Sequence, residues 1–492
     1  MKKSLLAVAA LTAFAGAAQA QSSVTIYGLI DVGVMGQTNT GNLNQGTFIL
    51  PSALSGTGAS GGSYVRPGTA FGGMGGGESQ SRLGFKGSED LGGGTKAIFL
   101  LETGFNPMTG TVADTGMNAT SKSNAGISGD TALQGQLFGR GAYAGLSNDK
   151  YGTLTFGRQQ NLMLDNIGGY DPVNAQLFSP IAYAGSYGGG GATDNSRVNQ
   201  AIKYVWKSNG FNANLLYAPG GVAGSSTAGT TTGAQAGWEN AKFGIQAIAS
   251  HTTDSMNLFS VDNSGSYCNT SGGTCVATPN TLTTGAAIPT GVANIFMNTT
   301  AYQVTTKWQA MDKLSLKAGY ERIILGTPSN FQQVENTSST PGGYSIGTNY
   351  ASQVNLFRNV VWFGGNYDIT PAVKGSLGYY YVGTPAYGNG TGAPSTAATG
   401  VNGSCGNAGY CSNGSTLRAG GCTGNAQYFS GLVDYNLSKR TNLYAAYNYT
   451  VLNGGQKAIL NTGTAGSAAA QLSASSVFTS QSTFGIGIRH MF

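Results

Sequence analysis

The sequence predicts an all-β fold, a closed antiparallel transmembrane β-barrel of sixteen strands with short periplasmic turns and long extracellular loops. Three observations lead to this prediction. Apolar and polar residues alternate with a period of two in many segments, charged residues are scarce, and short and long connections follow each other in strict alternation. Strands that alternate between two faces, joined in this way, are typical of barrels that cross a membrane.

Alternating segments recur from one end of the chain to the other. Between 24 and 34 the even-numbered positions are apolar except Gly28, while Thr25, Tyr27 and Asp31 share the other face. The same period appears at 197–207, 302–309 and 443–451. Because successive side chains of a strand point to opposite faces, the pattern predicts strands with one apolar and one polar face.

The composition argues against ordinary soluble domains. Charged residues make up 9% of the chain, whereas soluble domains carry about 25%. Beyond residue 20 no apolar run reaches the roughly 18 to 20 residues that a transmembrane helix needs. A barrel strand needs no continuous apolar run, because only every second residue meets lipid.

The first twenty residues have the layout of a secretory signal peptide. Lys2 and Lys3 precede a short apolar stretch at 5–15, and Ala18 and Ala20 form an A-x-A cleavage site. We therefore expect residues 1–20 to be removed and residues 21–492 to form the barrel. Removal lowers the formal charge from +6 to +4. The mature chain has no basic run with interleaved aromatics, so nucleic acid is not an expected partner.

The connections separate a barrel from a soluble β-sandwich. Long polar stretches alternate with short turns rich in Asp, Asn, Ser and Gly. The short turns are 88–94, 147–152, 208–210, 239–240, 310–313, 370–372 and 438–440. The long stretches are 35–79, 106–137, 160–196, 219–232, 251–298, 325–353, 384–425 and 453–478. Seven short and eight long connections join sixteen strands, an even number that leaves an aqueous channel.

Closure follows from the membrane environment. A sheet edge that faces lipid would leave backbone groups without hydrogen-bond partners, so the sheet must close on itself. We therefore expect the first strand, at 24–34, to pair with the last strand, at 480–492.

Five cysteines lie in polar stretches rich in Gly, Ser and Asn. They are Cys268, Cys275, Cys405, Cys411 and Cys422. In an oxidising compartment such residues can form disulfides within loops, and Cys268 with Cys275 is the nearest pair. The sequence leaves the connectivity open. The spacing and the lack of a nearby histidine do not favour zinc, so no metal is expected.

Several segments together identify a family. They are 23–31 (SVTIYGLID), 81–94 (SRLGFKGSEDLGGG), 96–105 (KAIFLLETGF), 138–146 (FGRGAYAGL), 156–159 (FGRQ) and the terminal 487–492 (GIRHMF). With these segments the chain resembles the Gram-negative general porins, most closely the β-proteobacterial type. The resemblance implies a sixteen-stranded barrel in the cell outer membrane, a homotrimer, and passive diffusion of small hydrophilic solutes and ions.

The resemblance also implies a constriction inside the barrel. It implies that the third long loop, here about 160–195, folds into the lumen, and this loop carries the acids Asp165 and Asp171. Basic side chains on the wall are expected to face these acids. The candidate basic residues are Arg82, Arg140, Arg158, Arg197 and Lys96.

Alternation along the strands predicts an inward side chain for some of these basic residues but not for all of them. Arg82 opposes Leu83, and Arg197 opposes an apolar series that includes Val198, so both are expected to point inward. Arg140 matches a position of the family. Arg158 shares its parity with Phe156 and needs a bulge or a strand end to face in. Lys96 shares the face opposite Ala97. Since the wall is basic, we expect a modest preference for anions.

Other functions remain as alternatives. A substrate-specific outer-membrane channel would use inward aromatics such as Tyr27, Tyr380 and Tyr444 as stacking surfaces. An enzyme would need a nucleophile and a base, and the two histidines, His251 and His490, form no evident constellation with a serine. No catalytic residues and no cofactor are expected. A structural or adhesive role would rest on the long external loops alone.

Overall fold

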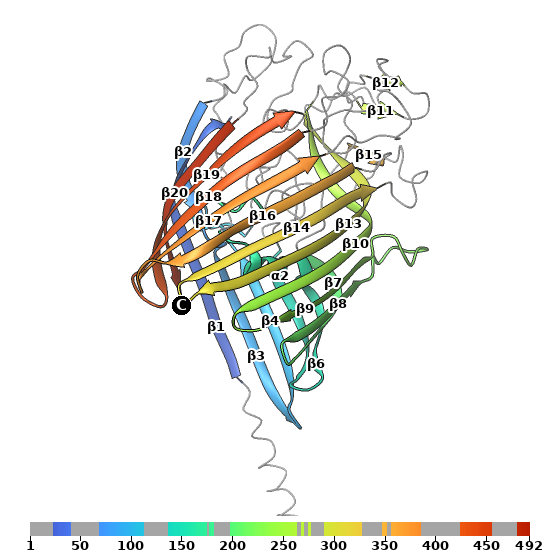
Figure 1. Ribbon diagram of the computed structural model, residues 1–492. Coiled ribbons are helices and arrows are strands. Elements are labelled where there is room, and N and C mark those ends of the chain that lie inside the picture. The colour runs from blue at the N-terminus through green and yellow to red at the C-terminus, as the bar shows by residue number, and fades with distance from the viewer. Residues whose placement is uncertain are drawn as a thin grey trace, which may run out of the picture.

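The computed structural model describes residues 23–40, 68–112, 136–174, 177–181, 197–262, 267–269, 274–276, 290–326, 347–351, 356–384, 424–454 and 480–492. Tilted strands surround a central lumen, and one short helix lies inside it (Figure 1). The sixteen antiparallel wall strands expected from the sequence are confirmed.

The wall strands are β1 (Ser23–Thr40), β3 (Arg82–Gly92), β4 (Thr95–Gly104), β5 (Gly141–Asn148), β6 (Gly152–Gln160), β7 (Arg197–Ser208), β8 (Phe211–Ala218), β9 (Thr231–Glu239), β10 (Phe243–Asp262), β13 (Thr290–Met311), β14 (Leu314–Gly326), β16 (Leu356–Asp368), β17 (Val373–Thr384), β18 (Gly424–Asn436), β19 (Thr441–Gly454) and β20 (Ser480–Met491). The remaining described elements are β2 (Gly68–Gly75), β11 (Tyr267–Asn269), β12 (Thr274–Val276), β15 (Gly347–Ala351) and α2 (Leu162–Tyr170).

The first and last strands close the barrel. β1 pairs antiparallel with β20 from Leu29, opposite Met491, to Gln37, opposite Thr483. Beyond the last strand, the Gly28 and Phe492 backbones exchange two hydrogen bonds of 3.1 Å. The predicted pairing of the chain ends is therefore confirmed, and the wall has no free edge at this seam.

The strand ends differ from the predicted ones on the side of the long loops. β10 continues to Asp262 and β13 begins at Thr290, inside the stretch expected to be a loop at 251–298. β1 likewise continues to Thr40. In these extensions, as in 255–262 (SMNLFSVD) and 290–298 (TGVANIFMN), apolar residues occur at both odd and even positions, so the period of two that marks a strand in the sequence is lost.

The second wall strand is interrupted. β3 pairs with the first half of β1, and β2 pairs with its second half. The intervening residues 76–81 turn toward the interior, where Asp31 accepts hydrogen bonds from the backbones of Glu78 (2.9 Å) and Ser79 (2.7 Å). β2 lies within the stretch 35–79 that was predicted to be a loop, because GTAFGGMG carries too few apolar side chains to show alternation.

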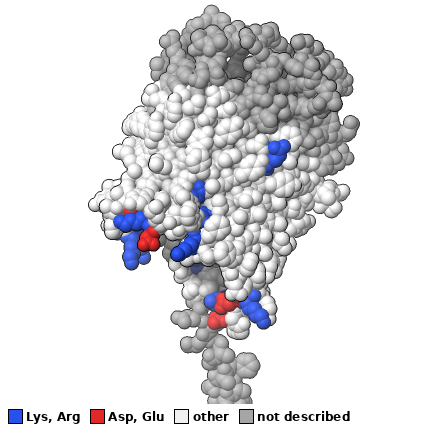
Figure 2. All heavy atoms as spheres, in the orientation of Figure 1, with Lys and Arg blue, Asp and Glu red and all other residues white. Residues whose placement is uncertain are grey.

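The outward face of the wall is apolar. Val24 and Ile26 on β1 are 67% and 63% exposed, and the same holds for large apolar residues of many other wall strands. Figure 2 shows an outer surface with few charged residues, most of them toward the end where the short turns lie. Such an apolar band is what a lipid bilayer requires.

None of the described helices is long and apolar enough to cross a membrane.

Candidate functional site: a charged constriction in the lumen

The helix α2 is the inserted part of the chain between β6 and β7. Asn161 caps its N-terminus, because the Asn161 side-chain oxygen accepts from the Leu164 backbone at 2.7 Å. Leu162, Met163 and Ile167 are buried among apolar residues of the inner wall. This local amphipathicity and the cap let nine residues hold a helix inside the barrel.

Polar contacts fix the helix against the far wall. The Asn166 amide donates to Gln303 Oε1 and to Thr305 Oγ1 of β13, both at 2.9 Å. On β16 the Trp362 indole donates to the Tyr170 backbone oxygen at 3.1 Å. The helix therefore has one orientation, and the lumen is narrowed on the side that α2 occupies.

Asp171, directly after the helix, is an anchor of the inserted segment. It is 2% exposed and accepts from the Val173 backbone (3.2 Å), from Tyr380 Oη on β17 (2.5 Å) and from Ser179 Oγ. Burial raises the pKa of the Asp171 carboxyl above its ordinary value, although these hydrogen bonds oppose the shift. The family resemblance implies a pore-facing acid at this position, whereas the structure encloses Asp171.

Arg82 and Arg140 meet Glu102 on the opposite inner wall. Arg140 Nε lies 2.5 Å from Glu102 Oε1, and Tyr27 Oη donates to Glu102 Oε2 at 2.8 Å. Both arginines also contact Gln80, since Arg82 donates to its backbone oxygen at 3.1 Å and Arg140 donates to its side-chain oxygen. Two guanidinium groups thus share one carboxylate, and the cluster carries net positive charge.

A second charged group lies on α2 and β7. Lys203 Nζ pairs with the Asp165 carboxylate and also donates to the Gln160 backbone oxygen at 3.1 Å. Arg197, which is buried, is close enough to act through its charge on both Asp165 and Arg82. The structure therefore brings Arg82, Arg140, Arg197 and Asp165 into one region of the lumen.

Two of the predicted basic residues lie elsewhere. Arg158 follows the outward Leu154 and Phe156 on β6, and its guanidinium contacts the Gly139 backbone oxygen (2.8 Å) and Asn199 (2.5 Å) near the strand end. The register of β6 with β7 shifts between Gly157 and Gln159, beside Arg158. Lys96 is exposed beside the β3–β4 turn, opposite Asp90.

Several residues of the site were not singled out from the sequence. Glu102 has the parity of Lys96, and Lys203 has that of Arg197, so alternation is consistent with the inner face but does not indicate that they pair with Arg140 and Asp165. Gln80 lies in the strand break at 76–81, where no periodicity exists to orient it. These pairings depend on the path of the inserted segment, which alternation along one strand does not encode.

The inward aromatics do not form open stacking surfaces. Tyr380 is completely buried against Asp171, and Tyr444 is 3% exposed and donates to Asp31 at 2.6 Å. Tyr27 is half-buried and donates to Glu102. A stacking ladder for sugars, the basis of the substrate-specific alternative, therefore lacks two of its three candidate residues.

Only two of the five cysteines lie within the described residues. Cys268 and Cys275 lie opposite each other in the β11–β12 hairpin. Cys405, Cys411, Cys422 and the signal peptide at 1–20 lie outside the described residues. Within the described parts of the chain, no three His, Cys, Asp or Glu side chains gather as a metal site would require.

Comparison with known proteins places the chain among bacterial channels. It is 38% identical over 175 residues to an outer membrane porin protein of Bordetella pertussis, covering 36% of this chain and 38% of that protein. It is 34% identical over 221 residues to outer membrane porin protein 32 of Delftia acidovorans, covering 44% and 50%. The chain thus spans half or less of the length of these curated relatives.

Solved structures resemble the whole barrel. The anion-selective porin from Comamonas acidovorans has a TM-score of 0.54 at 17% identity, covering 96% of this chain and 100% of that one. OmpT of Vibrio cholerae has a TM-score of 0.53 at 14% identity, covering 96% and 98%. Because the sequence identities are only 17% and 14%, the structural similarity establishes the fold and nothing further. The family model described as Gram-negative porin matches residues 7–455, nearly the whole length, and the chain therefore belongs to the Gram-negative porin family.

Proposed function

We propose that this protein forms a water-filled channel in the outer membrane for passive diffusion of small hydrophilic solutes and ions, with a modest preference for anions. The observation that carries the proposal is the basic cluster on the inner wall. Arg82 and Arg140 share the single carboxylate of Glu102 inside a closed barrel.

The charge of the lumen supports the preference for anions. Asp165 is paired with Lys203, and Asp171 is enclosed within the anchor of the inserted segment, so neither acid offsets the two arginines. A passage lined by one sign of charge with low-dielectric walls concentrates the oppositely charged ion. The resulting field favours anions while leaving neutral hydrophilic solutes free to pass.

Conductance in planar bilayers tests the channel itself. The purified protein should give large, stable open steps in KCl, and liposomes that contain it should swell in solutions of small sugars. Absence of both conductance and swelling, for protein that runs as a folded barrel in unheated electrophoresis, would overturn the channel and favour a structural or adhesive role.

We further propose a homotrimer. One solved form of Vibrio cholerae OmpT, which resembles this fold with a TM-score of 0.52, is recorded as a trimer. Chemical cross-linking in detergent should give a limiting band of three chains, and conductance steps should close in groups of three. A limiting monomer in both measurements would contradict the proposal.

We also infer that the barrel is not an enzyme. In the described residues His251 is hydrogen-bonded to Thr300 (2.8 Å) and His490 to Thr441 (2.9 Å), so each lies among threonines rather than beside an acid and a serine. Ester and phospholipid hydrolysis assays on the folded protein should give background rates. Turnover that His251→Ala or His490→Ala removes would contradict this inference.

A further inference from the structure

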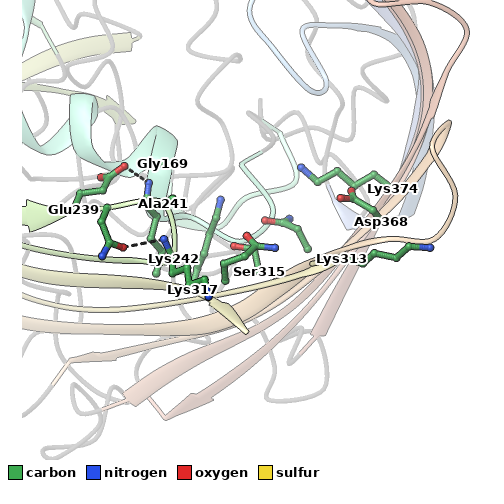
Figure 3. Close-up of a pocket in the computed structure, with 13 residues that line it drawn as sticks. Gly169, Glu239, Ala241, Lys242, Lys313, Ser315, Lys317, Asp368 and Lys374 are labelled. Atoms are coloured by element: carbon green, nitrogen blue, oxygen red, sulfur yellow. Dashed lines mark hydrogen bonds and ion pairs between the residues drawn. The ribbon is translucent and has the colours of Figure 1, made fainter. Parts of the chain in front are cut away.

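A polar recess lies at the periplasmic end of the lumen, away from the arginine cluster. It forms where the β9–β10, β13–β14 and β16–β17 turns approach the end of α2, and its volume is about 460 Å³ (Figure 3). In the strand order, β13 to β17 lie about half the circumference from β3 and β4, which carry Arg82 and Glu102. The recess is therefore separate from the arginine cluster, and the end of α2 at Gly169 contributes to its lining.

Five lysines from different elements line this recess. In Figure 3 the Lys374 side chain extends toward Lys317, whereas the Lys313 side chain extends away from both. Lys242 and Lys313 belong to the β9–β10 and β13–β14 turns, while Lys307, Lys317 and Lys374 project from the inner faces of β13, β14 and β17. The sequence separates these residues by up to 132 positions. Only closure of the barrel brings them together.

The carboxylates of the recess do not balance the lysines. Glu239 and Asp368 are the acids among its lining residues, and Glu239 is already paired with Lys307 at 2.5 Å. Lys317 donates to the backbone oxygen of Asp171 at 3.0 Å and forms no ion pair with its carboxylate, although the charge of that carboxylate acts on Lys317 from a greater distance. For the described part of the chain, no carboxylate oxygen lies within 4 Å of the ammonium groups of Lys242, Lys313 or Lys374.

We propose that the recess binds small multivalent anions that carry adjacent negative groups, such as pyrophosphate. Lys242 and Lys374 supply ammonium groups, and Lys317 lies deeper beside the inserted segment. An ammonium group on a flexible stem acts as a point charge that adapts to a phosphate or carboxylate without the fixed geometry of a guanidinium. A chloride ion contacts few lysines at once, whereas an anion with two charged groups can contact several.

The volume and the lining agree with this ligand class. Binding pockets for small molecules commonly have volumes of roughly 300–1,000 Å³. The uncharged lining consists mainly of polar side chains, among them Asn240, Gln309, Ser315 and Asn366. An apolar ligand would gain little from such a surface, while a hydrated anion finds both charge and hydrogen-bond donors.

Side-specific block of the channel tests the recess. The inference rests on the proposed channel but not on its preference for chloride. Pyrophosphate is added to one side of a bilayer in KCl at matched ionic strength. We expect a concentration-dependent block at lower concentrations from the side of the short turns than from the side of the long loops, and a weaker block by sulfate.

A charge-matched pair of variants identifies the lysines responsible. The double variant Lys242→Gln/Lys374→Gln should raise the half-blocking concentration of pyrophosphate about fivefold, as expected when two exposed charge pairs are lost together. The control Lys150→Gln/Lys439→Gln removes the same charge from exposed positions in other periplasmic turns and should leave the block unchanged. Equal effects of the two variants, or no block of the wild type, would overturn the proposal.

Equilibrium binding separates this inference from the proposed function. Titration calorimetry of the folded protein in detergent with pyrophosphate needs no conductance, and it should give heat that the recess variant loses and the control keeps. A cation-preferring or silent channel with this heat intact would contradict the proposed function and support the recess. A conducting channel without the heat would contradict the recess alone.

Discussion

Glu102 lies between two guanidinium groups in the lumen, and its charge sets how strongly they act on a passing ion. Replacing it by glutamine keeps oxygen and nitrogen atoms at Arg140 and Tyr27 but removes the negative charge. We therefore expect Glu102→Gln to increase the preference for anions, measured as a shift of the reversal potential across a KCl gradient. Glu89→Gln, an exposed position at the end of β3, serves as control. A shift no larger than that of the control would contradict the role assigned to Glu102.

Asp171 holds the inserted segment through three donors, two of them side chains. Asp171→Ala leaves the buried hydroxyls of Ser179 and Tyr380 without their acceptor, at a cost of about 1–3 kcal/mol for each buried group. We expect increased current noise, because the segment after α2 is held less firmly. Since burial raises the pKa of Asp171 and so favours the neutral carboxyl, Asp171→Asn should be much milder. Equal noise in the two variants would show that the acceptor does not anchor the segment.

At the scale of single elements, the β11–β12 hairpin carries a prediction about the cysteines. Cys268 and Cys275 are opposite residues of an antiparallel pair, for which Cα atoms lie roughly 4.5–5.5 Å apart. Disulfides require a Cα separation of about 4.4–6.8 Å. We expect a Cys268–Cys275 disulfide, seen as a cross-linked peptide in non-reducing mass spectrometry and lost in Cys268→Ser. A bond from Cys268 to Cys405, Cys411 or Cys422 would contradict this pairing.

The strands could be predicted from the sequence because the alternation in each strand depends only on the lipid and water at its own two faces. Lipid on one face and water on the other impose alternation on residues such as Val24 to Val34, and no knowledge of the neighbouring strand is needed. The inserted segment could not be traced in this way. The place of Asp171 depends on Tyr380, which is 209 positions away, and the recess lysines are joined only by closure. The break at 76–81 was missed for the related reason that glycine carries no apolar signal.

At the scale of the whole molecule, the barrel is a closed wall with an apolar outside and a charged, narrowed inside. The pairing of β1 with β20 removes the edge that lipid would leave without hydrogen bonds. The basic groups on the inside then act in an enclosed space, where field lines are focused along the passage. From this arrangement we expect the ion preference to follow the lumen charges and to be insensitive to charges on the outer face.

The reversal potential across a KCl gradient tests this account most directly. The wild-type channel should have a reversal potential of the sign that chloride permeation gives, and Arg82→Gln should reduce it. Arg158→Gln, which removes the same charge near the end of β6, where Arg158 contacts Gly139 and Asn199, should leave it unchanged. A wild-type potential of the opposite sign, or equal effects of the two arginine substitutions, would contradict the claim that the inner arginine cluster sets the preference for anions.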